Sequence, residues 1–296
     1  HAEKPSLVYT SITGFGQDGP HANWKYSDIV GQAVGGVMTL AGEPADPPNM
    51  IYGNQANVCA SIQAAQGTLI AVLHAEATGQ GQHVDVSAQE AISMAQETAM
   101  QTWDLQKKNR VRTGERGSLP FTLPGLGVYK TKDGYATLMI LAPAGADFPD
   151  LVAWMRERGM QGDLDEEPYA SICQQLNMPF VTQVLSNPDS AAQMVPQLMH
   201  IHEQVAKFIA TLTSVEAYEE GQRRKLLIGI VSTPQNLAEN TQLRARDWYR
   251  KLEFEYLNKI IEFPGPPYRL SETPAVIQRP PRLGEHTDQV LAELRS

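Results

Sequence analysis

The longest apolar stretch of the chain, Ala60–Ala75, has a pattern that predicts a helix buried on all sides. Ala, Leu, Ile and Val fill nearly every position, and His74 is its one ionisable side chain. A surface helix would show polar positions with a period of 3.6 residues. Asn57 stands at the entry, where a short polar side chain can accept from an unpaired backbone N–H. We therefore expect any chemistry of the chain at the mouth of this helix, within Ile51–Gln82.

Short apolar runs on either side of this stretch predict strands of a buried parallel sheet. The run Leu7–Ile12 leads into a Gly-rich loop, Thr13–Pro20, and a second run follows the central helix at His83–Ser87. An α/β protein binds ligands in loops at the carboxyl ends of such strands. GFGQDGP is no phosphate-binding motif, however, so a plain connection stays an alternative.

Two more helices are expected beside the central one. Tyr26–Leu40 contains three glycines, which lower helix propensity and are tolerated where another backbone approaches closely. Asp28, near its start, either favours the helix dipole or belongs to a site. Ser87 and Glu90 form the S-x-x-E pattern of a capping box, which predicts a helix that runs to about Lys108 and packs beside the central one.

The rest of the chain predicts a smaller α+β domain and a return segment. Alternating apolar residues around Lys132-Asp133-Gly134 predict a hairpin over Gly127–Leu141. Amphipathic helices follow over 148–228, then a short strand at 228–234 and one short helix at 236–246. The predicted divisions are a large domain at 1–110 that is incomplete at its N-terminus, a linker and small domain at 111–235, and a return segment with a terminal helix at 236–296.

Charge narrows the choice of partners. The formal net charge of −9 argues against nucleic acid as the main partner and leaves room for a local basic pocket. Three arginines in the loop Asn109–Pro124 could bind phosphate, although a solvated hinge is the plainer interpretation. The acidic turn Asp163–Glu167 lacks the ligand spacing of a calcium loop, so no metal is expected.

Other features of the composition bear on location. The two cysteines, Cys59 and Cys173, are too few for a disulfide framework and fit a reducing cytoplasm. No apolar run of membrane-spanning length is expected, because Gly67, His74 and Glu76 interrupt the longest one. No signal-peptide pattern is present. The chain starts at His1 and soon enters a strand, which suggests that an upstream segment is missing.

Five motifs in this order resemble the family III CoA-transferases. They are SITGFGQDGP (Ser11–Pro20), YSDIVGQAVGGVMTLAGEP (Tyr26–Pro44), HAEATGQGQHVDVSAQEA (His74–Ala91), GVYKTKDGY (Gly127–Tyr135) and LSETPAVIQRPPRLGEHTDQVL (Leu270–Leu291). The resemblance implies a Rossmann-like parallel-sheet large domain, a smaller α+β domain and dimers whose chains interlock like rings. The family's first β/α units, which carry much of the CoA pocket, are absent from this sequence.

The resemblance also implies a mechanism that needs an aspartate at the mouth of the central helix. Its carboxylate attacks the thioester of an acyl-CoA, a mixed anhydride forms, and CoA passes to an acceptor carboxylate. Counting back from Gly67 and the turn Thr78–Gln82 assigns this aspartate to Asn57. An amide cannot form the anhydride. Cys59 is a conceivable substitute, although buried cysteines are mostly packing residues.

The resemblance further assigns residues to the substrate and CoA cleft. The loop residues Gly14, Phe15, Gly16 and Gln17 line it, together with Asp28 and Glu43. Lys25 matches a position that reaches the CoA phosphates, and a solvated lysine beside Trp24 is the alternative.

Three functions therefore stay open. The chain is a CoA-transferase that moves CoA between an acyl-CoA and a free carboxylic acid, or a non-catalytic subunit paired with an Asp-bearing family member. The third is an acyl-CoA racemase, isomerase or lyase, but a racemase needs a His where Ser27 stands and an Asp at Asn57. We expect a homodimer or heterodimer in the cytoplasm, CoA only as part of the substrate, no permanently bound cofactor, and neither nucleic acid nor membrane as a partner.

Overall fold

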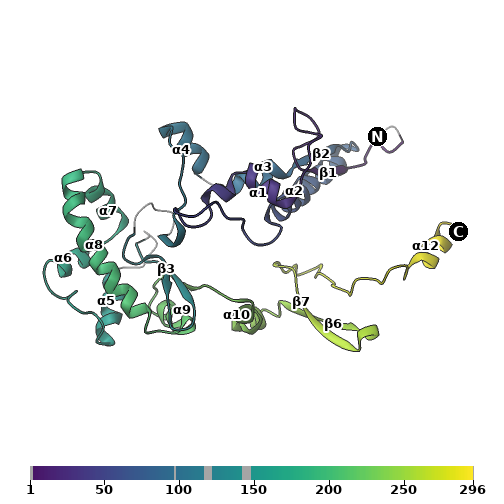
Figure 1. The fold of residues 1–296 in the computed structure, drawn as a ribbon. Helices are drawn as coiled ribbons and strands as arrows, with labels where there is room; N and C mark the ends of the chain where they lie inside the picture. Colours follow the sequence, from purple (N-terminus) through teal and green to yellow (C-terminus); the bar gives the residue numbers. More distant parts are fainter. Residues whose placement is uncertain (1–2, 97, 117–121, 142–147, 296) are drawn as a thin grey trace. The chain divides into compact units, whose positions relative to one another are not determined.

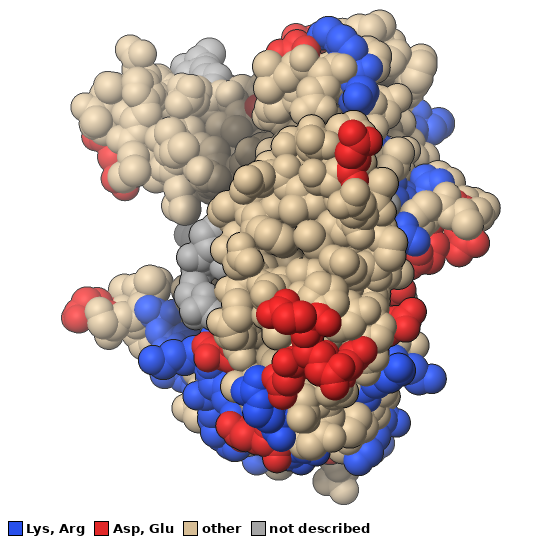
Figure 2. Space-filling view, turned by 90° about the vertical axis from the view of Figure 1, so that its left-hand side faces the viewer, with Lys and Arg blue, Asp and Glu red and all other residues tan. Residues whose placement is uncertain are grey.

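The computed structural model describes residues 3–96, 98–116, 122–141 and 148–295 of the chain (Figure 1). They form two compact units, divided between Ile230 and Val231. Acidic and basic side chains lie next to one another on the face shown in Figure 2, with uncharged surface between such groups.

The first unit contains a parallel pair of strands, β1 (Tyr9–Thr13) and β2 (His83–Ser87). The crossover between them holds α1 (Asp28–Val34), the 3-10 helix η1 (Val37–Leu40) and α2 (Gln55–Thr78). These helices lie beside the two strands in Figure 1. Parallel strands require a long crossover of this kind. The predicted α/β class with a parallel sheet is confirmed, and β1 lies one to two residues beyond the predicted run.

The central helix α2 forms as predicted, but the prediction that it is buried on all sides is wrong for this chain. Its buried positions are all alanines, among them Ala60 and Ala64, which pack against β2 and the following helix. Its opposite face leaves the large side chains of Ile62, Leu69 and Leu73 between 61% and 66% exposed. Apolarity alone does not separate these faces, because Ala and Leu count alike in the pattern.

The same helix corrects a second expectation. By length and composition alone, α2 is apolar enough to cross a membrane, so the interruptions at Gly67, His74 and Glu76 do not shorten it below spanning length. This is weak support for a membrane span, because the core helix of a globular protein meets the same criteria.

The helix predicted over Tyr26–Leu40 is shorter and breaks at two glycines. A side chain on Gly35 would lie 2.2 Å from the Ile92 side chain, and Gly36 has a φ of +86°, which favours glycine. The close approach expected at these glycines is therefore present. It brings α1 against α3 (Ala88–Ser93).

The helix predicted from Ser87 to about Lys108 is divided into α3, the 3-10 helix η2 (Met94–Gln96) and α4 (Ala99–Gln106). The Ser87 side chain accepts from the backbone N–H of Glu90 at 3.3 Å, so the predicted N-cap is confirmed. Of the two α-helices, α3 packs on α2, whereas α4 buries none of its described residues.

The predicted hairpin is confirmed as β3 (Leu126–Lys130) and β4 (Tyr135–Met139), and β5 (Ile228–Ile230) pairs with the other edge of β4. Helices cover this antiparallel sheet around a core in which Trp154 and Phe208 meet edge to face at 4.9 Å. They are α5 (Phe148–Glu157), α6 (Tyr169–Gln175), α7 (Met178–Leu185), α8 (Pro188–Ile209) and α9 (Ser214–Arg223).

The second unit is built from short elements. The single helix predicted over 236–246 is two helices, because Asn240 ends the first and caps the second by accepting from Leu243 N–H at 2.9 Å. Among its described residues, Phe254 alone is a buried hydrophobic residue. The elements are α10 (Pro234–Glu239), α11 (Thr241–Ala245), the antiparallel strands β6 (Tyr249–Phe254) and β7 (Lys259–Pro264), the 3-10 helix η4 (Glu255–Leu257) between them, and α12 (Thr287–Glu293).

Candidate active site at the mouth of helix α2

The mouth of α2 is built around the ring of Tyr26. A side chain on Gly14 would lie 2.5 Å from this ring, and one on Gly31 would lie 2.5 Å from its hydroxyl. The two glycines therefore leave the space that the ring fills. Its hydroxyl donates to Oδ1 of Asn57 at 3.1 Å. Burial, and then the charge of Asp28, raise the pKa of Tyr26, so the hydroxyl stays a neutral donor.

Asp28, and not Asn57, caps α2. Oδ1 of Asp28 accepts the backbone N–H of Asn57 at 2.9 Å, in the first turn of the helix. A carboxylate there satisfies an orphan donor and favours the helix dipole. The prediction that Asn57 is the cap is wrong. The residue at the N-cap position is Asn54, and its side chain makes no capping hydrogen bond.

Gln32 holds this cap in place, and sequence reasoning missed it. Its side chain is fully buried, and its Nε2 donates to Oδ2 of Asp28 at 2.7 Å and more weakly to the carbonyls of Ile51 and Gly53. Its Oε1 accepts from Ile51 N–H at 2.9 Å. Both carboxylate oxygens of Asp28 are thus engaged. The available signal was a glutamine one turn after Asp28 in an apolar, Gly-rich helix.

The predicted Gly-rich loop follows β1 and is fastened to β2. The backbone N–H of Gln17 donates to Oδ2 of Asp85 at 2.8 Å, and its side-chain amide donates to Oγ of Ser11 at 2.5 Å. Gly16 has a φ of +86°, and the Gly14 carbonyl accepts from the start of α3 at 3.1 Å. Gln17 is therefore turned back toward the sheet.

Glu43 lies against a different segment. Its Oε1 accepts from Glu115 N–H at 3.2 Å, and a side chain on Gly114 would collide with its carboxylate. Arg112 donates to the backbone carbonyls of Thr39, at the end of η1, and of Glu43 and Asp46, so this arginine fixes the segment that carries Glu43. Within the part of the chain that the structure describes, no hydrogen bond joins Glu43 to Asn57.

Four rings beside the mouth form what we call the aromatic cluster: Phe15, His21, Trp24 and Tyr26. Phe15 meets the other three rings edge to face at 6.1 to 6.2 Å, and His21 stacks on Trp24 at 3.7 Å. Of these four rings, sequence reasoning named only Phe15 as a site residue, and it missed the cluster. The signal was visible, because four aromatic residues lie between positions 15 and 26. Lys25 follows Trp24 and makes no hydrogen bond or ion pair with any described residue. Its contact with the CoA phosphates stays a prediction.

The remaining nucleophile is a packing residue. Cys59 is half-buried and packs against two small apolar clusters, one that contains Ala60 and Ala64 and one that contains Val37 and Ile92. No group of three His, Cys, Asp or Glu side chains with metal-binding geometry occurs among the described residues. In the acidic turn, Asp163 pairs with His200 at 2.8 Å.

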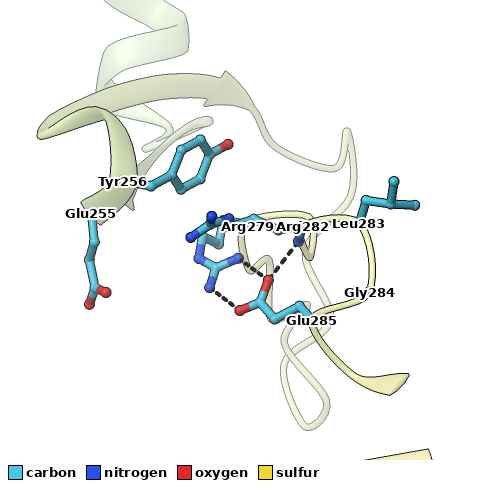
Figure 3. A pocket seen from close by; sticks show the side chains of 7 residues that line it. All are labelled: Glu255, Tyr256, Arg279, Arg282, Leu283, Gly284 and Glu285. Carbon is cyan, nitrogen blue, oxygen red and sulfur yellow. Dashed lines mark hydrogen bonds and ion pairs between the residues drawn. The ribbon is translucent and has the colours of Figure 1, made fainter. Parts of the chain in front are cut away.

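The second unit has a cavity of about 380 Å³ of its own (Figure 3). Glu285 binds the guanidinium of Arg279 and accepts the backbone N–H of Arg282 at 2.6 Å. The hydrogen bond from Arg279 chiefly lowers the pKa of Glu285, to about 2. The guanidinium of Arg282 lies 5.2 Å from the centre of the Tyr256 ring. The contact of Arg282 with Tyr256 ties residues 279–285 to the turn between β6 and β7, so we interpret the cavity as structural.

Comparison with known proteins gives consistent matches. Residues 1–287 match the family model CoA-transferase family III. The succinyl-CoA:(R)-benzylsuccinate CoA-transferase subunit BbsE of Thauera aromatica is 32% identical over 97% of this chain and 65% of its own length. The succinate–glutarate CoA-transferase of Agrobacterium fabrum is 27% identical over 99% of this chain and 66% of its own length. The chain thus spans just under two thirds of the length of these relatives.

A solved structure shows the same fold. The crystal structure of a CAIB/BAIF family protein from Brucella suis superposes with a TM-score of 0.75 at 21% sequence identity. The match covers 99% of this chain and 69% of that one.

Proposed function

Because the chain belongs to CoA-transferase family III, we propose that it is a subunit of a heteromeric enzyme that moves CoA between an acyl-CoA and a free carboxylic acid. The observation that carries this proposal is Asn57, an amide at the position where the family resemblance implies a nucleophilic aspartate. In the proposed complex, a partner subunit that bears this aspartate supplies the reacting carboxylate.

The contacts at the mouth favour this proposal over a chain that is catalytic by itself. The carboxylate in contact with Asn57 belongs to Asp28, and its two oxygens hold the α2 backbone and Gln32. Engaged in this way, it is a poor nucleophile. Cys59 is half-buried in packing. A racemase has less support still, since Ser27 and Asn57 occupy positions that need proton-transferring groups.

The relatives suggest where to start with substrates. BbsE is named as a subunit of a succinyl-CoA-dependent transferase, and the second relative is named for succinate. Succinyl-CoA is therefore the first donor to test. CoA enters as part of this substrate. A cytoplasmic location, and contacts of substrate or CoA with Gly14–Gln17, Lys25, Asp28 and Glu43, stay predictions.

The composition of the native complex tests the proposal. The chain is tagged in its own cells, purified and weighed intact by native mass spectrometry. We expect a second family member that carries an aspartate at the matching position, in a complex that transfers CoA from succinyl-CoA. Replacing that aspartate by asparagine should lower the rate by roughly 10⁴-fold or more. Asn57→Ala should change it little, since Asn57 takes no part in the covalent step.

A homodimer that transfers CoA by itself would contradict the subunit role. In that case Asn57→Asp separates the remaining possibilities, because a gain in CoA exchange identifies position 57 as the nucleophile site. Asn54→Asp is the matched control. It introduces the same charge three residues earlier, where the family resemblance implies no nucleophile.

A further inference from the structure

We propose that the aromatic cluster binds the aryl group of a carboxylic acid substrate, either free or as its CoA thioester. The inference deepens the proposed CoA-transferase function and rests on it. Its basis is Trp24, a residue that is 60% exposed although two rings of the cluster, Phe15 and His21, pack against it.

Two rings of the cluster pack against Trp24 and leave part of its surface open. His21 stacks on it at 3.7 Å with an interplanar angle of 24°. Phe15 meets it edge to face at 6.2 Å and 79°. A flat ring can therefore add to this cluster from the open side, in the offset or edge-to-face arrangements that aromatic groups prefer. The neighbouring rings already restrict the Trp24 side chain. Binding of an aryl group therefore costs less side-chain entropy here than at an isolated tryptophan.

The cluster continues to the mouth of α2. Phe15 also meets the ring of Tyr26 at 6.1 Å and 90°, and the Tyr26 hydroxyl donates to Asn57. Glycine at position 14 is required for this continuity, since a side chain there would occupy the space of the Tyr26 ring. The aromatic surface and the position of the family nucleophile thus belong to one connected group of side chains.

A second flat ring could reach the same surface, namely the adenine of CoA. Lys25 follows Trp24 and could attract its phosphates. We commit to the aryl group of the acid, because the rings connect through Tyr26 to the mouth of α2, which is the acyl end of the cleft that the family resemblance implies. Adenine binding is an outcome that the experiment separates.

Binding of free acids tests the inference without requiring CoA transfer. The chain, purified from its own cells with the subunits it retains, is titrated with benzylsuccinate, butylsuccinate, succinate and free CoA by saturation-transfer NMR. Trp24→Ala should weaken the binding of benzylsuccinate about 3- to 10-fold, in line with the loss of one aromatic pair. The affinity for butylsuccinate should fall clearly less, and the affinities for succinate and CoA should not change. Trp103→Ala is the control, since Trp103 on α4 is similarly exposed, at 52%.

Three results would overturn the inference. The first is the absence of benzylsuccinate binding to the unaltered protein. The second is an equal loss for benzylsuccinate and butylsuccinate, which would mean a general apolar contact. The third is a loss confined to CoA, which would assign the cluster to adenine. Failure of the proposed function would give a different result from these three. CoA exchange would be missing, while the binding of benzylsuccinate would still depend on Trp24.

Discussion

At the scale of single residues, the mouth of α2 depends on a polar network more than on any one catalytic group. Asp28 caps the helix from α1, and buried Gln32 joins this carboxylate to the backbone of Ile51. Buried polar groups are tolerated because each has a partner. The network therefore sets the position of residue 57, whichever chain of a complex reacts.

Replacing Gln32 should show how much this network contributes to stability. Gln32→Leu leaves Ile51 N–H and one Asp28 oxygen without their partner, and buried unsatisfied groups are costly. We expect the free energy of unfolding to fall by about 2–4 kcal/mol, measured by urea denaturation. Gln66→Leu on the exposed side of α2 is the matched control and should change it by less than about 0.5 kcal/mol. Equal effects of the two variants would contradict a structural role for the network.

Asp133 caps a helix in a similar way, at the hairpin turn between β3 and β4. Its Oδ1 accepts from the backbone N–H and hydroxyl of Ser214 at 2.7 and 2.9 Å. The hydrogen bond from the Ser214 backbone is the main cause that lowers the pKa of Asp133. Since the folded pKa is below the unfolded one, this stabilisation is present above the unfolded pKa and is lost as the pH falls through the folded pKa.

Asp133→Asn should therefore lower the stability of the protein at neutral pH. The stability of the variant should then fall less steeply than that of the unaltered protein as the pH is lowered. Asp133 is exposed, so screening limits the effect to about 1 kcal/mol or less. Melting temperatures between about pH 6 and pH 3 would measure the difference from the unaltered protein, which should shrink as Asp133 becomes protonated. Asp18→Asn, an exposed loop variant, should leave the pH profile unchanged. A constant difference at every pH would argue against the carboxylate as the cause.

These two carboxylates also show what the sequence could and could not predict. Local caps are visible in the chain itself, and the pattern of Ser87 and Glu90 predicted one of them correctly. Asp28 and Asp133 cap helices that begin 27 or more residues later, through contacts that exist only after folding. Asn57 thus lies at the helix mouth as predicted, but the prediction that its side chain caps the helix is wrong, because the sequence could not show which side chain would reach its N–H.

At the scale of elements, α2 shows that hydropathy predicts a helix more readily than its environment. The apolar run was interpreted as burial on every side, yet only the alanine face is buried. Small side chains at a spacing of about four residues let the helix approach β2 and α3 closely. The hairpin and the helices of 148–228 were easier to predict, because their alternating and amphipathic patterns mark one buried face. The apolar run that predicted β1 as a buried strand was wrong about burial in the same way as α2, since β1 has no buried residue.

Matched leucine substitutions on α2 should separate the two faces. Ala64→Leu adds volume where Ala64 is 5% exposed in the core cluster, and we expect a loss of about 1–3 kcal/mol. Ala65→Leu makes the same change at the neighbouring exposed position and should change the free energy of unfolding by less than about 0.5 kcal/mol. Chemical denaturation of both variants measures the difference. Similar losses would mean that the outer face of α2 is also packed in solution.

At the scale of the whole molecule, the two units differ in how much core each can form. The first unit surrounds Trp154 and Phe208 with helices and a three-stranded sheet. Among the described residues of the second unit, Phe254 alone is a buried hydrophobic residue, and the sheet there is a two-stranded hairpin. Such a hairpin is marginally stable without further packing. The second unit therefore needs contacts beyond its own residues to be stably folded.

Hydrogen exchange measured by mass spectrometry should reveal this difference. In the isolated chain, amides of β6 and β7 should exchange orders of magnitude faster than those of α5 and α8, because local opening of the hairpin costs little free energy. In the native complex that we propose, β6 and β7 should become protected, since we expect the partner subunit to cover them, while α5 and α8 change little. Phe254→Ala is the control variant and should remove the residual protection of the hairpin alone. Slow exchange of β6 and β7 in the isolated chain would show that the second unit is stable by itself.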